Sequence, residues 1–175
     1  MCKKQLEYKK VKLLIAKFCI LNNIQKPTYR INNTIHDYGL YYIKKGNREL
    51  IINLNKCHLS TLNKNSCYIS DKTITGVTIH EFAHYLHYTL YYNEILKKFK
   101  RLKEALIHFR EMDIEEDIAE SIRLFITNPT LLQEGRPKRY KILSKYFKPL
   151  VNIHYTGLVK YKNSMFLYNW LEGIY

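Results

Sequence analysis

The chain has 175 residues, 46% of them hydrophobic, and a formal net charge of +14. This length allows one globular domain with its own core, so we expect a single domain over 1–175. No apolar run approaches the ~20 residues that span a bilayer. Lysines interrupt the N-terminal apolar segment, which argues against a secretory signal peptide. We therefore expect no membrane partner, and a cytoplasmic protein or, if the source is a phage or virus, a virion-associated one.

The positive charge is concentrated in two flanks. Residues 1–60 hold 12 basic and three acidic side chains, 61–130 hold nine and ten, and 131–175 hold eight and two. Solvated lysine-rich faces explain such flanks, and contact with a polyanion, above all nucleic acid, explains them as well. The sequence shows no recognition helix and no aromatic–basic RNA-binding strand. Charge therefore supports nonspecific nucleic-acid contact at most.

The N-terminal region, 1–70, predicts a helix followed by short strands. Apolar residues at helical spacing indicate a helix over 3–21, and Pro27 prevents its continuation. Runs rich in β-branched and aromatic residues predict three strands, at 29–32, 40–45 and 48–55. Gly46-Asn47 has the composition of a hairpin turn between the last two. The run at 66–70 is compatible with a further edge strand.

The rest of the chain predicts helices. Asp71 is a candidate N-cap for a helix that extends to about residue 92, and Asp113 is one for a helix that ends before Asn128-Pro129. Two further helical segments are 93–110 and 137–147. The elements predict an α+β fold in which a small antiparallel sheet packs on the helix after Asp71 and on the one after Asp113. Three regions result: helix and sheet at 1–70, paired helices at 71–130, and a basic C-terminal region at 131–175.

The segment VTIHEFAHYLHY, 77–88, is the first candidate for chemistry. At about 100° per residue, His80, Glu81 and His84 lie on one edge of a helix. The apolar residues lie on the other side: Ile79, Phe82, Ala83, Leu86 and Leu90. Histidines four residues apart can bind one zinc ion, and Glu81 is placed to take a proton from a water molecule that zinc polarises. The alternative is a helix with surface histidines.

A zinc site of this kind needs a third protein ligand. The metzincin pattern requires Gly at position 87 and His at position 90, where this chain has His87 and Leu90, so that class is excluded. We expect His87 to be a surface group or to lie next to a ligand, without binding the metal itself.

The segment EEDIAESIRLFITNP, 115–129, offers the third ligand. Glu116 and Glu120 lie one turn apart on the side opposite the apolar residues, with Arg123 beside them. We expect Glu116 to bind zinc, and Glu120 to accept the remaining N–H of a zinc-bound histidine and so fix its tautomer. The alternative is a solvated acidic face in which Glu116 completes a capping box with Asp113.

HEFAH followed by EDIAESIRLF resembles the gluzincin-type zinc metallopeptidases of the anthrax lethal factor and Pro-Pro endopeptidase group. It is also similar to small phage and mobile-element metallopeptidases related to the ImmA/IrrE proteins. The glutamate helix of that group carries Glu-x-x-x-Glu with Ala before the second Glu and Arg three residues after it. Glu116, Ala119, Glu120 and Arg123 match that pattern. Over about 71–130, the resemblance implies a zinc-dependent endopeptidase that acts on a protein or peptide substrate.

One position departs from the group. The lethal-factor proteins have a Tyr seven residues before the zinc-binding Glu, where it helps to stabilise the oxyanion. This chain has Phe109 there, with His108 next to it. Either His108 or one of the many tyrosines supplies the oxyanion donor, or the protein is a weaker catalyst. The alternative function is a metallopeptidase-fold protein of little or no activity, serving as a basic component associated with virions or nucleic acid.

Overall fold

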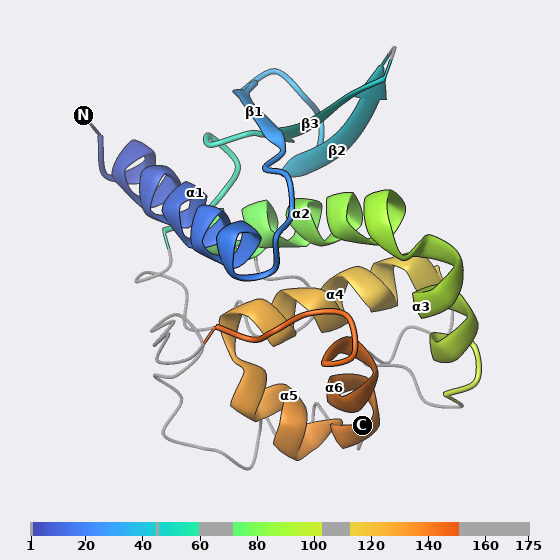
Figure 1. The fold of residues 1–175 in the computed structure, drawn as a ribbon. Coiled ribbons are helices and arrows are strands. Elements are labelled where there is room, and N and C mark those ends of the chain that lie inside the picture. Colours follow the sequence, from blue (N-terminus) through green and yellow to red (C-terminus); the bar gives the residue numbers. More distant parts are fainter. Residues whose placement is uncertain (1, 45, 60–71, 103–112, 151–175) are drawn as a thin grey trace.

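A computed structural model describes residues 2–44, 46–59, 72–102 and 113–150. The helices are α1 (Lys3–Leu21), α2 (Ile74–Leu90), α3 (Tyr92–Phe99), α4 (Ile114–Thr127), α5 (Pro129–Gly135) and α6 (Pro137–Leu143). The strands are β1 (Thr28–Ile31), β2 (Gly39–Lys44) and β3 (Asn47–Ile52). This confirms the α+β class. Figure 1 shows the sheet on one side of α2 and α4 on the other, with α5 and α6 beyond α4.

The sheet is mixed, with strand order β1-β3-β2. β2 and β3 pair antiparallel and place Tyr41 opposite Leu50, whereas β1 and β3 pair parallel and place Tyr29 opposite the same residue. The expectation of an antiparallel sheet is therefore wrong for β1. The loop between β1 and β2 leaves room for β3 to enter between them. Asn53, at the end of β3, holds that loop, because its side chain donates to the carbonyl of Ile35 at 2.9 Å and its backbone N–H to that of Tyr38.

The turn between β2 and β3 lies one residue earlier than the sequence predicts. Lys44 pairs with Asn47, so the connection is residues 45 and 46, and Asn47 already belongs to β3. Gly46 has a φ of 82°, in the left-handed region that glycine adopts without a steric penalty. The candidate edge strand at 66–70 lies outside the described residues.

The helix caps differ from the predicted ones in one case. Thr73 caps α2, because its hydroxyl accepts the N–H of Gly76 at 2.9 Å. Asp71, the predicted cap, lies outside the described residues. Asp113 caps α4 as predicted and accepts the N–H of Glu115 at 3.2 Å.

The core forms around α2. Ile79, Phe82 and Leu86 are fully buried, as the helical spacing predicts, and Phe82 meets Phe18 of α1 edge to face at 6.0 Å. Burial of each such side chain contributes about 1.5–3 kcal/mol. Leu90, also expected in the core, is exposed because it is the last residue of α2. Packing on several sides thus fixes the helix that carries the HExxH pattern.

The C-terminal helices are shorter than predicted, and one was not predicted at all. Asn128-Pro129 ends α4 but also starts α5, since the Asn128 side chain accepts the N–H of Leu131 and Pro129 occupies the first helical position. α3 covers the start of the predicted 93–110 helix, whose remainder falls largely outside the described residues. Within the described ranges, no helix has the length and apolar character needed to cross a membrane.

Candidate metal centre

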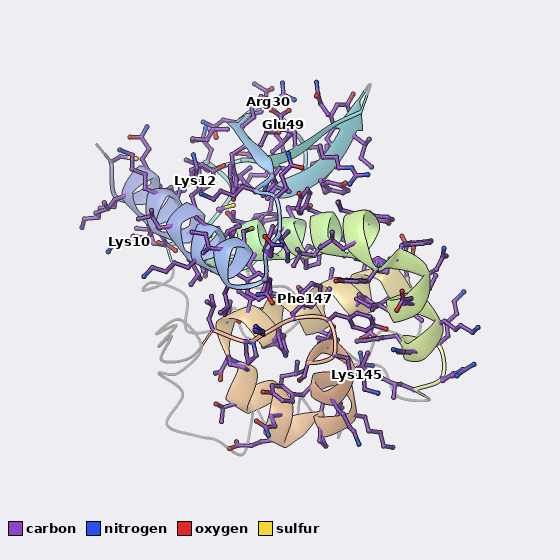
Figure 2. The ribbon with its side chains drawn as sticks, viewed as in Figure 1. Lys10, Lys12, Arg30, Glu49, Lys145 and Phe147 are labelled. Atoms are coloured by element: carbon purple, nitrogen blue, oxygen red, sulfur yellow. The ribbon has the colours of Figure 1, made fainter. Side chains whose placement is uncertain are left out.

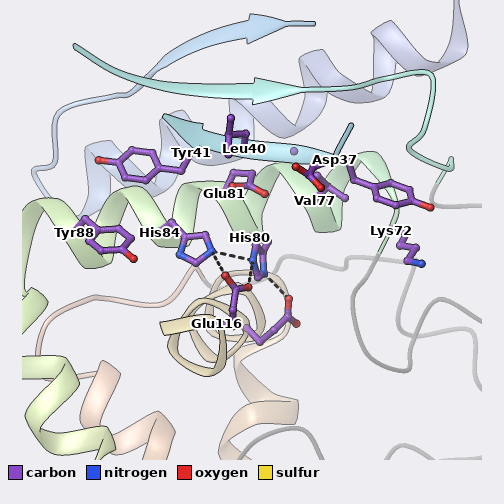
Figure 3. Close-up of a pocket in the computed structure, with 13 residues that line it drawn as sticks. Asp37, Leu40, Tyr41, Lys72, Val77, His80, Glu81, His84, Tyr88 and Glu116 are labelled. Atoms are coloured by element: carbon purple, nitrogen blue, oxygen red, sulfur yellow. Dashed lines mark hydrogen bonds and ion pairs between the residues drawn. The ribbon is translucent and has the colours of Figure 1, made fainter. Parts of the chain in front are cut away.

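The two packed helices α2 and α4 bring three possible ligands together. His80 and His84 project from adjacent turns of α2, and Glu116 projects toward them from the first turn of α4 (Figure 3). The Nε2 atom of His80 lies 3.0 Å from Oε2 of Glu116, and that of His84 lies 3.2 Å from Oε1. The two Nε2 atoms are 3.1 Å apart. The side chains thus converge on one point from two elements.

The spacing of these atoms fits a tetrahedral metal ion. Ligand bonds of about 2.0–2.1 Å at tetrahedral angles place neighbouring ligand atoms about 3.3 Å apart. The observed separations, 3.0, 3.1 and 3.2 Å, are slightly shorter, and the two that involve Glu116 end on different oxygens of its carboxylate. Two imidazoles with one carboxylate suit zinc, and the same set also occurs at non-haem iron centres. The residues therefore fit a divalent transition metal with at least one coordination position left for another ligand.

Glu120 and Arg123 lie behind the His80 ring, at the inner end of the cleft that Glu120 helps to line. The Nδ1 atom of His80 is 2.7 Å from Oε1 of Glu120, and the Nε of Arg123 donates to Oε2 of the same carboxylate at 2.7 Å. Both Glu120 and Arg123 are buried. This contact directs the Nε2 atom of His80 toward Glu116 and His84, which is the arrangement that outer hydrogen bonds impose on metal-binding histidines.

The carboxylates change the protonation of His80. Burial alone lowers its pKa, but hydrogen bonds to Glu116 and Glu120 outweigh that effect and raise the pKa to about 10. The pKa of Glu116 falls far below its ordinary value, chiefly because of its hydrogen bonds to His80 and His84. Burial raises the pKa of Glu120, yet the charges of Arg123 and His80 prevail and lower it to about 2. Without a metal, the proton on the His80 imidazole holds the ring to both carboxylates.

Glu81 lies beside the ligands and faces the start of β2. The backbone N–H of Tyr41 donates to its carboxylate, while burial raises the pKa of Glu81. Gly39 lies directly against it: a Cβ there would be 2.8 Å from Cγ of Glu81 and 2.7 Å from Cγ1 of Val77. Only glycine lets the strand approach Glu81 this closely, so the strand constrains the position of the carboxylate.

A cleft of about 460 Å³ opens over these groups (Figure 3). Beside His84 its wall is aromatic, because the ring of Tyr88 stacks on that of Tyr41 at 5.8 Å and on His84 at 6.1 Å. Asp37 and Lys72 also line it, and Figure 3 places them on the Val77 side, away from the two stacked tyrosines. The cleft thus has one aromatic and one charged end.

Two other histidines need separate mention. His87 is fully buried, with its ring 4.8 Å from that of Tyr92, and neither ring nitrogen has a hydrogen-bond partner among the described residues. Burial lowers its pKa to about 4, so the ring is neutral. It does not line the cleft, and the expectation that it is a surface group is wrong. His108, the candidate oxyanion donor, and Phe109 lie outside the described residues.

From the sequence we expect an edge strand to border the cleft, but the pattern does not identify the β2 residues that contact the site. Gly39 and Tyr41 contact Glu81, but the strand pattern that contains them carries no mark of such a contact. The sequence also did not single out Tyr88, because the chain has 16 tyrosines. Its place one turn after His84 is the only signal that could have singled it out, because residues four apart share a helix face.

No known protein family, curated protein or solved structure matches this chain. The functional argument therefore depends on the geometry of the cluster and on the motif resemblance.

Proposed function

We propose that the protein is a zinc-dependent endopeptidase that hydrolyses a peptide bond with an activated water molecule. The observation that carries this proposal is the convergence of His80, His84 and Glu116 at a cleft in which a fourth group, Glu81, lies half-buried beside them. A metal site that serves only structure has four protein ligands and no open face. Three ligands, an adjacent carboxylate and an open cleft support a catalytic site.

Each residue has a distinct task in this proposal. Zinc bound by the three ligands would supply Lewis acidity and lower the pKa of a water molecule. Glu81 takes the proton from that water and delivers it to the leaving amine, and its raised pKa brings it closer to the pH at which such transfer is efficient. Glu120 holds the ring of His80 in the ligating orientation. No covalent bond to the protein is required.

The edge of β2 supports a peptide as substrate. β2 is an outer strand of the sheet in the part of the chain that the structure describes, and its first residues line the cleft. The backbone of Asn53 bonds to Tyr38, so by the alternation of antiparallel pairs Gly39, Tyr41 and Ile43 direct their backbone groups away from β3. The Tyr41 N–H already donates to Glu81, and an extended peptide can pair with the remaining outward backbone groups of this edge beside the metal ligands. Substrate binding by strand addition is therefore part of the proposal.

The alternative is a binding protein with little activity. Two residues that bear on oxyanion stabilisation support it. Phe109 replaces the tyrosine of the lethal-factor group. Tyr88, whose ring lines the cleft, donates its hydroxyl to Glu115. In that case the basic flanks, with their nonspecific contact to nucleic acid, would carry the function, and the metal site would persist with little or no turnover.

The decisive experiment combines metal content with hydrolysis of a mixed peptide library, followed by mass spectrometry. We expect one zinc per chain in the wild type and in Glu81→Gln, with hydrolysis reduced by about 10²–10⁴-fold in the variant. Glu116→Ala should lose the metal, whereas Glu94→Gln, an exposed control on α3, should keep metal and activity. Zinc binding with no cleavage by the wild type would favour the alternative. Zinc retained by Glu116→Ala would refute the ligand assignment.

A further inference from the structure

The outer face of α1 carries an exposed stripe of aliphatic side chains. Leu6, Leu13 and Ile20 are 45%, 64% and 73% exposed. They lie seven residues apart, so each is about 20° from the previous one around the helix axis, and they form a nearly straight line. The opposite face of α1 is already occupied by the core, where Ile15 and Phe18 are fully buried. The stripe is therefore not part of the packing that holds α1 in place.

Lysines flank the stripe on both sides. Lys3, Lys10 and Lys17 are also seven apart and exposed, and they run along one side of the aliphatic line; exposed Lys9 lies on the other. The remaining lysines of α1 turn toward the protein: Lys4 donates to the carbonyl of Leu54, and Lys12 lies over the ring of Tyr29.

The acidic side chain of α1 is also turned inward. Glu7 accepts a hydrogen bond from the hydroxyl of Thr75 at the start of α2. The outer face of α1 is thus aliphatic along its middle and positively charged at both sides, with no acidic group to offset the lysines.

We propose that this face of α1 binds the surface of an anionic lipid bilayer. The helix would lie in the plane of the membrane, with Leu6, Leu13 and Ile20 among the upper acyl chains and the lysines at the phosphate groups. Each exposed aliphatic adds about tenfold to partitioning when it leaves water. Each lysine near an anionic surface adds about fivefold. Neither contribution requires the metal, so this proposal is independent of peptidase activity.

A helical partner fits this face less well. A coiled-coil seam needs a second apolar position between the members of the stripe. Depending on the register, that position is Lys9 or Lys10 in one heptad and Ala16 or Lys17 in the next. A second copy of the chain would set lysines against lysines. The stripe therefore has the wrong pattern for knobs-into-holes packing.

Nucleic acid fits less well for a different reason. Phosphates would engage the lysines but leave the aliphatic stripe in water. Lys10 and Lys145, one from each basic flank, also do not belong to one patch. Figure 2 shows Lys10 on α1 and Lys145, just after α6, at widely separated places. Our expectation of no membrane partner considered only segments that span a bilayer. A helix that lies on the membrane surface does not require such a segment.

Vesicle co-sedimentation of the full chain tests the proposal, with neutral phosphatidylcholine vesicles compared with vesicles containing 30% phosphatidylserine. We expect binding to the anionic vesicles only. Leu13→Gln with Ile20→Gln should lower the partition coefficient by about 100-fold. Lys10→Gln with Lys17→Gln should lower it by about 25-fold. All four side chains are exposed, so circular dichroism should show folded variants. Matched controls are Ile43→Gln, an exposed aliphatic on β2, and Lys141→Gln with Lys145→Gln, exposed lysines in and after α6.

Absence of binding to anionic vesicles would overturn the proposal. So would vesicle binding that depends on the two lysines but not on Leu13 and Ile20, since insertion is then not involved. Tight binding of duplex DNA with that same lysine-only dependence would reassign the face to nucleic acid. A dimer in sedimentation that Leu13→Gln with Ile20→Gln dissociates, without lipid binding, would assign the stripe to self-association.

Discussion

Helix α4 carries a carboxylate–arginine network on each of two sides, with both partners buried at Glu120 and the carboxylate half-buried at Asp117. Toward α2, Glu120 accepts hydrogen bonds from Arg123 and His80. Toward α6, Arg139 donates through one nitrogen to both Asp117 and Ser121, each at 2.9 Å, and its guanidinium lies 5.1 Å from the ring centre of Phe99. The two networks use the same kind of ion pair on the same helix.

The networks differ in their third member. The first ends on an imidazole whose far nitrogen reaches an open cleft, whereas the second ends on a serine hydroxyl inside the protein. An ion pair that fixes a ring at a cleft acts on whatever that ring binds. An enclosed pair fixes only its own helices, here α4 and α6. A buried charged network therefore does not by itself mark a functional site. It does so when one of its members reaches a cleft.

The largest expected effect belongs to the enclosed network. Arg139→Ala removes one partner, leaving Asp117 without its guanidinium and a cavity next to Phe99, so we expect a loss of about 3–5 kcal/mol in the free energy of unfolding. Urea denaturation of the metal-free protein measures it. Lys141→Ala, on the exposed side of α6, should change stability by less than about 0.5 kcal/mol.

We expect the folded Arg139→Ala protein to bind zinc with unchanged affinity. If zinc affinity falls together with stability, the two networks act as one unit and the distinction between them is lost. A destabilisation below about 1 kcal/mol would show instead that water readily replaces the guanidinium.

The next effect belongs to the network at the cleft. Glu120→Gln keeps the shape of the side chain but removes the charge that holds His80, so zinc affinity should fall by about 10–100-fold. Asp117→Asn, the equivalent change in the enclosed network, should leave zinc affinity within about twofold of the wild type. Titration against a fluorescent chelator measures both. Equal losses in the two variants would contradict the assignment of separate roles.

The elements predicted well from the sequence are those set by local patterns. The predicted helix over 3–21 matches α1 because buried residues recur at helical spacing, as Val11, Ile15 and Phe18 do. The proximity of His80 to Glu116 needed only one further fact, that α4 packs on α2. Periodicity within each helix had already placed the histidines on one edge and the glutamates on another.

Features that depend on distant partners could not be predicted in this way. The parallel pairing of β1 with β3 arises from where the loop places β3, which no alternation pattern records. Gly39 contacts Glu81 across 42 positions of the chain, and nothing local distinguishes it from a strand glycine. His87 is buried because α3 turns so that Tyr92 covers it. In each case the tertiary neighbour decides the role of the residue.

The smallest predicted effect concerns pH and separates the networks once more, because only one contains a titrating group that must change charge when metal binds. His80 has a pKa of about 10 without metal, so it carries a proton at pH 7 that Nε2 must lose to bind zinc. The unprotonated fraction rises about tenfold per pH unit below the pKa, so the zinc dissociation constant should fall about tenfold from pH 6.5 to 7.5. Calorimetry in two buffers of different ionisation enthalpy should detect about one proton released per ion. Glu120→Gln removes one carboxylate that raises this pKa and should reduce the release, whereas Asp117→Asn should not. An affinity independent of pH over this interval would show that His80 is already neutral and that its carboxylate partners orient the ring without holding its proton.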